Sequence, residues 1–155
     1  MGVTSPGAPA VAVHLRRAQE TDAPALQELI RQLGYERTAE DIAAQLAALD
    51  LTRQNVIVAE LAGEVIGCLS TSIMHVLHRP RPVGRISMMV VAQHLRGHRI
   101  GAALVREAER VLAEAGCGFV EVTSNAKRAD AHRIYERLGY QRTSLRFARD
   151  VSSEG

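Results

Sequence analysis

The chain has 155 residues, of which 46% are hydrophobic but only 3% aromatic, and its formal net charge is +2. A chain of this length suits one domain, with a core built from aliphatic side chains rather than aromatic rings. The small net charge argues against a protein that coats nucleic acid through many phosphate contacts, and the apolar content excludes a disordered chain.

The ends of the chain and its two cysteines indicate a single cytoplasmic domain. We expect a flexible leader over residues 1–10, one domain over 11–150 and a flexible tail over 151–155. No apolar run approaches the length that spans a bilayer, so a cytoplasmic protein is expected. Cys68 and Cys117 lie in apolar surroundings without metal-ligand spacing, which predicts reduced core residues.

The first elements are predicted to be one strand and two helices. A short strand is expected over residues 11–17. The next helix begins near Thr21 and ends at Gly34, because its apolar residues recur at helical spacing between these two signals. A second helix is expected over residues 39–49, with Thr38 as its cap.

A β-hairpin and a third strand follow. Apolar residues alternate from Asn55 onward, and the turn at 62–64 leads into a partner strand that reaches about Val76. The Arg-Pro-Arg-Pro stretch at 79–82 cannot pair within a sheet, so it is expected to be a loop before a strand over 85–91.

The second half of the chain alternates helices and strands. The expected elements are a helix that begins at about residue 100 and ends at Gly116, a strand over 119–124, a helix over 129–138 and a last strand over 140–149. This order predicts an α/β fold, with a mixed sheet of about six to seven strands and about four helices. The strands on either side of the first of these helices should be parallel neighbours.

The loop Gln93–Ala102 carries the most chemical information. It lies between an apolar strand and an amphipathic helix, and it contains Gly97 and Gly101. Backbone N–H groups that open a helix have no intrahelical acceptor and lie at the positive end of its dipole. Glycines let a ligand approach the main chain, so the loop is typical of a diphosphate cradle. An ordinary helix start explains the same pattern.

Basic residues gather on both sides of this loop. No acidic residue occurs between Glu64 and Glu107, whereas six arginines do: Arg79, Arg81, Arg85, Arg96, Arg99 and Arg106. We expect a cationic surface around the loop, with a solvated surface of no special role as the alternative.

Two blocks resemble motifs of the GNAT superfamily, the N-acetyltransferases that use acetyl-CoA. The first is Met88–Val91 followed by Arg96–Ala102, which is similar to the strand and pyrophosphate loop of that family. The second is Ala131–Tyr140, which is similar to the later helix that ends Tyr-Glu-x-Leu-Gly-Phe/Tyr. Both occur in the family's order, separated by one helix and one strand.

The resemblance implies acetyl-CoA as cosubstrate. Main-chain groups of Met89, Val90 and Val91 would hydrogen-bond the acetyl and pantetheine arm. The residues that would wrap the diphosphate are Arg96, Gly97, His98, Arg99, Ile100, Gly101 and Ala102. No metal is implied, and the loop histidines lack the grouped spacing of a metal site.

Two positions depart from the family pattern. Arg99 stands where the family has Gly, so its N–H contact requires that the backbone there avoid positive φ. The Arg99 side chain is alternatively a further phosphate contact. Asn125 is a candidate cofactor contact, although it precedes Tyr135 by ten residues, a longer gap than the family's.

The resemblance also suggests catalytic groups. Tyr135 matches the tyrosine that protonates the coenzyme A sulfur, a role that suits a phenol because it stays protonated at neutral pH. The alternative is a core aromatic on the buried stripe of its helix. Glu121 and His75 are the two candidate bases, and a chain of water molecules is the alternative proton acceptor. The alternative for Glu121 is a solvated or ion-paired carboxylate without a catalytic role, and for His75 a half-buried strand residue.

The expected function is therefore transfer of an acetyl group from acetyl-CoA directly to a primary amine of a small molecule or a protein. The alternative is a non-catalytic acyl-CoA sensor that acts through a protein partner. A homodimer is expected and a membrane partner is not. Nucleic-acid binding is disfavoured because the aromatic residues that stack on bases are scarce.

Overall fold

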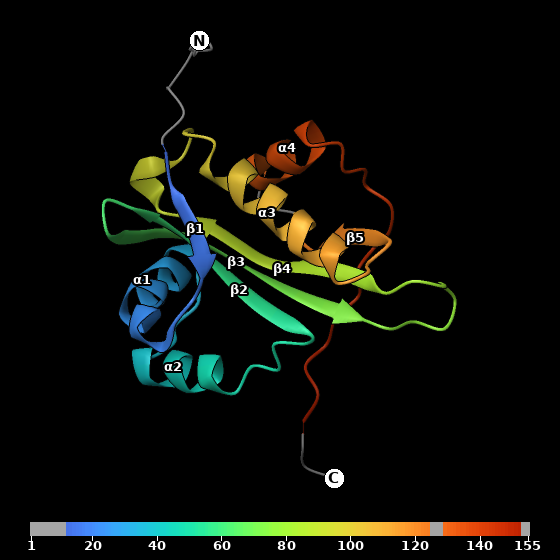
Figure 1. The fold of residues 1–155 in the computed structure, drawn as a ribbon, viewed down its shortest axis with the longest axis horizontal. Coiled ribbons are helices and arrows are strands. Elements are labelled where there is room, and N and C mark those ends of the chain that lie inside the picture. Colours follow the sequence, from blue (N-terminus) through green and yellow to red (C-terminus); the bar gives the residue numbers. More distant parts are fainter. Residues whose placement is uncertain (1–11, 125–128, 153–155) are drawn as a thin grey trace.

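The computed structural model describes residues 12–124 and 129–152, which form an α/β domain (Figure 1). Its strands are β1 (His14–Arg17), β2 (Gln54–Leu61), β3 (Glu64–Met74), β4 (Val83–Val91) and β5 (Phe119–Val122). Its helices are α1 (Ala23–Leu33), α2 (Ala39–Ala47), α3 (Ile100–Glu114) and α4 (Ala129–Arg137), with 3-10 turns η1 (Glu20–Asp22) and η2 (Gln93–Leu95).

The strands form one mixed sheet in the order β1-β2-β3-β4-β5. The first four pair antiparallel, whereas β4 and β5 are parallel and are connected through α3, as the sequence predicts. Helix α1, flanked by α2, packs against one face of β3 and β4, and α3 packs against the other face (Figure 1). Helix α4 lies beside α3. The sheet thus forms the middle of three layers.

The core is aliphatic, as the composition predicts. Leu69, Ile86, Leu104 and Leu112 are fully buried between the sheet and the helices. Both cysteines are free and buried, which confirms the prediction of reduced core residues. Burial also raises the pKa of the Cys68 thiol to about 12, because the thiolate would be desolvated there.

The helix boundaries follow local signals. The Thr38 side chain accepts a hydrogen bond from the Asp41 N–H at 3.1 Å, as an N-cap should. Gly34 and Gly139 follow α1 and α4 with φ of +111° and +95°, a left-handed conformation that glycine adopts without strain.

The last predicted strand is wrong. Residues 141–152 form neither strand nor helix, and Leu145 and Phe147 are 82% and 88% exposed. A strand needs a hydrogen-bonding edge and a surface that buries one of its faces. In the described chain this segment meets neither requirement, so the described sheet has five strands rather than six to seven.

Candidate functional site

The parallel strands β4 and β5 separate halfway along the sheet. They pair only from Val83 with Phe119 to Ile86 with Val122, and the Thr123 N–H donates to the Ile86 carbonyl at 3.3 Å. β4 continues to Val91 after this pairing has ended. The second half of β4 therefore has an open edge toward the space that β5 leaves.

A bulge fixes which groups face this open edge. Ser70 pairs with Met88 and Thr71 with Ile86, so Ser87 is an extra residue in β4. The Ala92 N–H donates to the Ile66 carbonyl of β3 at 2.8 Å. Because main-chain groups alternate along a strand, those of Met89 and Val91 point away from β3, toward the open edge. A peptide-like ligand can add there as a strand does.

The loop after β4 presents unpaired donors at the start of α3. Gly97 has φ of +90°, and Ile100 is the first helical residue. Within the described residues, no carbonyl or side chain accepts a hydrogen bond from the N–H of Ile100, Gly101 or Ala102. The first bond of the helix runs from the Ala103 N–H to the Arg99 carbonyl at 3.2 Å. Three donors at a helix start suit an anion.

The backbone at Arg99 has the positive φ that the predicted N–H contact would have to avoid. It caps α3 in the left-handed conformation with φ of +64° and ψ of +17°. For a residue with a Cβ this costs about 1–2 kcal/mol relative to the right-handed form. The loop therefore keeps the backbone shape that glycine normally supplies, with an arginine in that position.

Helix α4 closes the other side of the opening. A Cβ on Gly101 would meet the Ile134 Cδ1 at 3.4 Å and the Met89 Cε at 3.5 Å, so the start of α3, α4 and the open half of β4 meet here. The glycine at 101 allows this close packing.

Tyr135 lies on the buried side of α4. It is 8% exposed, it packs into the core, and its ring contacts that of Tyr140 edge to face with centroids 5.9 Å apart. Its hydroxyl has no hydrogen-bond partner among the residues that the structure describes. Burial raises the pKa of Tyr135 to about 12, so the phenol is a proton donor at neutral pH.

Of the two candidate bases, Glu121 is paired with an arginine and His75 lies away from the open edge. Glu121 accepts two hydrogen bonds at its Oε1, from Arg85 Nε at 2.8 Å and Nη2 at 2.6 Å. His75 is exposed directly after β3, whose last residue, Met74, pairs with Val83. The β3 partners of Val83 and Met89, Met74 and Leu69, are five residues apart, about 17 Å along the sheet. The described structure does not bring His75 to the open edge. Asn125 lies outside the described residues.

The six arginines do not all surround the loop. Arg79 stacks on the Phe119 ring at 4.0 Å, Arg81 donates to carbonyls of Gly116 and Cys117, and Arg85 binds Glu121. These three lie near the start of β4, at the opposite end of the strand. The predicted cationic surface is therefore limited to the remaining three. The structure confirms the alternative of an ion-paired carboxylate at Glu121, but the sequence could not name Arg85 as its partner, because only strand register brings these residues together.

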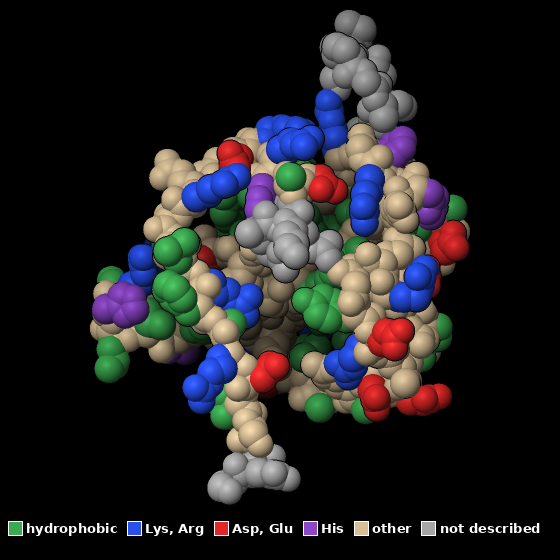
Figure 2. All heavy atoms as spheres, turned by 180° about the vertical axis from the view of Figure 1, so that it is seen from behind, with side chains coloured by type: hydrophobic (Ala, Val, Ile, Leu, Met, Phe, Trp, Pro, Cys, Tyr) green, Lys and Arg blue, Asp and Glu red, His purple; other side chains and the backbone are tan. Residues whose placement is uncertain are grey.

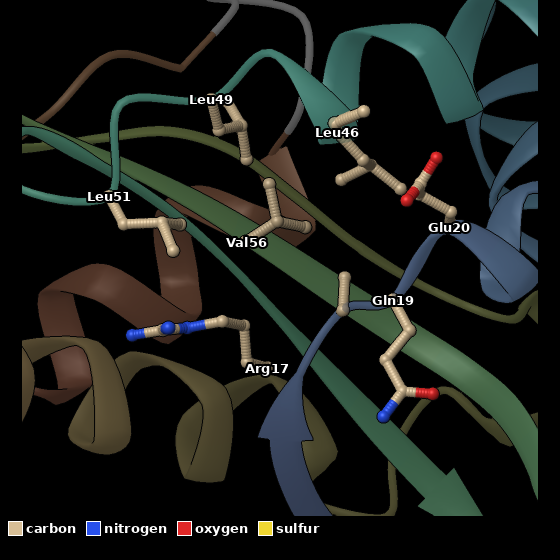
Figure 3. Close-up of a pocket in the computed structure, with 9 residues that line it drawn as sticks. Arg17, Gln19, Glu20, Leu46, Leu49, Leu51 and Val56 are labelled. Carbon is tan, nitrogen blue, oxygen red and sulfur yellow. The ribbon is translucent and has the colours of Figure 1, made fainter.

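A separate pocket lies at the far edge of the sheet. It has a volume of about 270 Å³ between the end of β1, the start of β2 and the end of α2. Leu46, Leu49, Leu51 and Val56 surround the same apolar space (Figure 3). None of the site residues expected from the sequence lines it, so it is not part of the open edge.

Comparisons with known proteins agree with this geometry. The family model described as "Acetyltransferase (GNAT) family" matches residues 20–140. The aminoalkylphosphonate N-acetyltransferase of Salmonella typhimurium is 33% identical over 140 residues, which cover 87% of this chain and 89% of that protein. In the described part of the chain, no helix is long and apolar enough to cross a membrane.

Solved structures share the fold. Glucosamine-6-phosphate N-acetyltransferase from Arabidopsis thaliana has a TM-score of 0.79 at 19% identity, over 91% of this chain and 99% of that chain. An acetyltransferase from Trypanosoma brucei has a TM-score of 0.75 at 24% identity, over 90% and 100% of the two chains. The family match and the curated relative favour an enzyme over the acyl-CoA sensor. The chain belongs to the GNAT acetyltransferase family, whose members use acetyl-CoA, and it is an N-acetyltransferase.

Proposed function

We propose that this enzyme acetylates the primary amine of a small acceptor that also carries an acidic group, with aminoalkylphosphonates as the first candidates. The observation that carries the proposal is the open half of β4 beside three unpaired N–H groups of α3. The acceptor class is taken from the Salmonella relative, which is named an aminoalkylphosphonate N-acetyltransferase.

Acetyl-CoA fits this arrangement because it is a long anion with a peptide-like arm. The N–H groups of Ile100, Gly101 and Ala102 would bind the diphosphate. Main-chain groups of Met89 and Val91 would hydrogen-bond the pantetheine arm as a neighbouring strand does. Further contacts are proposed from the family resemblance at Arg96, Gly97, His98 and Asn125, and for Arg99 through its side chain, because its φ of +64° does not meet the condition set for an N–H contact. The main-chain groups of Val90 face β3, so the contact expected there is not proposed again.

The chemistry needs placement and one proton donor. The amine nitrogen forms a bond to the acetyl carbonyl carbon, the carbon–sulfur bond breaks, and the sulfur leaves with the bond's electrons. Tyr135 gives its hydroxyl proton to that sulfur and regains one from solvent. Placement can lower the barrier by about 7–11 kcal/mol, and a positioned acid adds roughly 10²–10⁴-fold.

The amine must lose a proton before or during attack. Glu121 already accepts two hydrogen bonds from Arg85, and His75 lies beyond the end of β3. We therefore favour water as the proton acceptor. If Glu121→Gln or His75→Gln shifts the acidic limb of the pH–rate profile, the residue replaced is the base instead.

The proposal includes a homodimer in the cytoplasm. The far edge of β5 pairs with no strand in the described chain, and Leu145 and Phe147 are exposed side chains two residues apart in the segment 141–152, which forms neither strand nor helix. An unpaired edge and an unburied apolar pair suit association with a second copy. Light scattering that gives the mass of one chain at micromolar concentration would contradict the dimer.

Thiol release tests the reaction. Purified protein is incubated with acetyl-CoA and one amine from a panel: 2-aminoethylphosphonate, an aminoglycoside, a polyamine or a lysine peptide. We expect release of coenzyme A and a gain of one acetyl mass on 2-aminoethylphosphonate. Acetylation of the other amines alone would contradict the acceptor class, and no thiol release with any amine would contradict the proposed activity.

A further inference from the structure

A row of polar side chains crosses the sheet on the face opposite α3. Gln54 of β2 pairs with Ser72 of β3, Ser72 pairs with Arg85 of β4, and Arg85 pairs with Glu121 of β5. Register partners in neighbouring strands point to the same face of a sheet. A Cβ on Gly84 would lie 2.7 Å from Leu112 of α3, so the next residue, Arg85, points to the other face.

Arg85 and Glu121 are partly exposed to solvent on this face. Seen from behind in Figure 2, the molecule has a central hollow with basic and acidic side chains beside it. Arg85 and Glu121 keep 39% and 35% of their side-chain surface exposed. Neither α1 nor α2 therefore covers this pair, and a solute can reach it.

The Arg85–Glu121 pair is organised for more than stability. An ion pair this exposed contributes about 0–1 kcal/mol to folding. Both donated hydrogen bonds end on Oε1 of Glu121, from Nε and Nη2 of Arg85. Among the described residues, nothing accepts a hydrogen bond from Nη1. Glu121 thus fixes the plane of the guanidinium, and one edge of the guanidinium stays available to an anion.

The row lies within reach of the open half of β4. The Ser70 and Ser87 hydroxyls form a hydrogen bond of 2.9 Å on the same face, at the bulge between Arg85 and Met89. The β3 partners of Arg85 and Met89, Ser72 and Leu69, are three residues apart, about 10 Å along the sheet. An arginine side chain and a short acceptor molecule can span that length together, with the acceptor amine at the open edge.

We propose that Arg85, held in position by Glu121, binds the phosphonate or phosphate oxygens of the amine acceptor and so determines its specificity. This inference rests on the proposed function for the orientation of the acceptor. A guanidinium matches two oxygens of a tetrahedral oxyanion with parallel N–H donors, whereas an ammonium offers a single point charge. Arg85 does not touch the thioester; it positions the acceptor.

The test compares two acceptors of equal chain length, 2-aminoethylphosphonate and ethanolamine. Arg85→Gln should lower kcat/KM for the phosphonate by about ten- to a hundredfold, mostly through KM, and leave ethanolamine unchanged within about twofold. Arg85→Lys should recover part of the loss. Glu121→Gln should raise KM for the phosphonate by a smaller factor, because the amide holds the guanidinium less firmly.

Arg110→Gln is the matched control, because it also removes an arginine from an exposed ion pair, on α3 at the other face of the sheet. Arg110→Gln should leave kcat/KM unchanged for both acceptors. Equal losses for both acceptors in Arg85→Gln, or no loss for the phosphonate, would overturn the inference. Acetyl-CoA binding by calorimetry should match wild type in every variant, which separates a local effect from misfolding.

Direct binding separates this inference from the proposed function. We expect 2-aminoethylphosphonate to bind the wild-type complex with coenzyme A and to lose at least tenfold in affinity in Arg85→Gln. If Arg85-dependent binding occurs without turnover, the anion site stands and the proposed reaction fails. If turnover occurs and binding is the same in Arg85→Gln, the reaction stands and the anion site fails.

Discussion

Replacing Tyr135 with phenylalanine should slow acetyl transfer without weakening the fold or the binding of acetyl-CoA. The tyrosine hydroxyl has no hydrogen-bond partner in the described structure, so its loss should change the free energy of unfolding by less than about 0.5 kcal/mol. The ring would remain in the core beside Tyr140. The main-chain donors proposed for the diphosphate are also unaffected.

The size of the kinetic effect follows from the loss of the hydroxyl proton that Tyr135 gives to the leaving sulfur. Burial raises the pKa of Tyr135 to about 12, so at pH 7.5 fewer than about one phenol in ten thousand is ionised, and nearly every molecule carries the proton. Removing a positioned acid typically costs about 10²–10⁴-fold in kcat, whereas the larger contribution from placement remains. We expect kcat to fall at least a hundredfold, with KM for acetyl-CoA unchanged within about threefold.

The assay is thiol release at saturating acetyl-CoA, with calorimetry of coenzyme binding in parallel. Tyr140→Phe is the matched control, since its hydroxyl donates to Glu109 Oε2 at 2.7 Å away from the opening. It should cost about 1–3 kcal/mol of stability but keep kcat within about threefold. A Tyr135→Phe enzyme with wild-type kcat would refute the acid role.

Three further predictions concern the scaffold. The hydrogen bonds from Arg16 hold the pKa of Asp22 below its usual value, so Asp22→Asn should destabilise the fold by about 1–3 kcal/mol at pH 7. The contribution of the carboxylate is lost as the pH falls through its folded pKa. Urea titrations should therefore show the stability difference between wild type and variant shrinking below about pH 4. Gly84→Ala should cost about 1–3 kcal/mol in the same assay, because its Cβ would lie 2.7 Å from buried Leu112; equal stability would show that α3 shifts without penalty. Thr38→Ala should cost about 1 kcal/mol by removing the α2 cap, and Thr38→Ser should restore most of it.

Elements with local signals could be predicted from the sequence. Thr38 and Gly34 bound their helices because a cap and a left-handed glycine act within one turn. The glycine turn between β2 and β3 likewise fixes a hairpin, and the crossover after β4 requires a parallel neighbour.

Features that depend on residues far apart in the chain could not be predicted from the sequence. The pattern at Leu145 and Phe147 suits a strand, yet no edge of the described chain pairs with that segment. The Arg85–Glu121 pair arises from register between strands separated by α3. The left-handed backbone of Arg99 is imposed by the turn into α3 against the preference of the residue.

The account depends on the start of α3 and the open half of β4 as the place where acetyl-CoA binds. The most direct measurement is a titration of ¹⁵N-labelled protein with coenzyme A, followed by backbone amide resonances. We predict that the amides of Ile100, Gly101 and Ala102 shift most, together with those of Met89 and Val91. Saturable binding that leaves these five amides unmoved, or no binding at millimolar coenzyme A, would contradict the account.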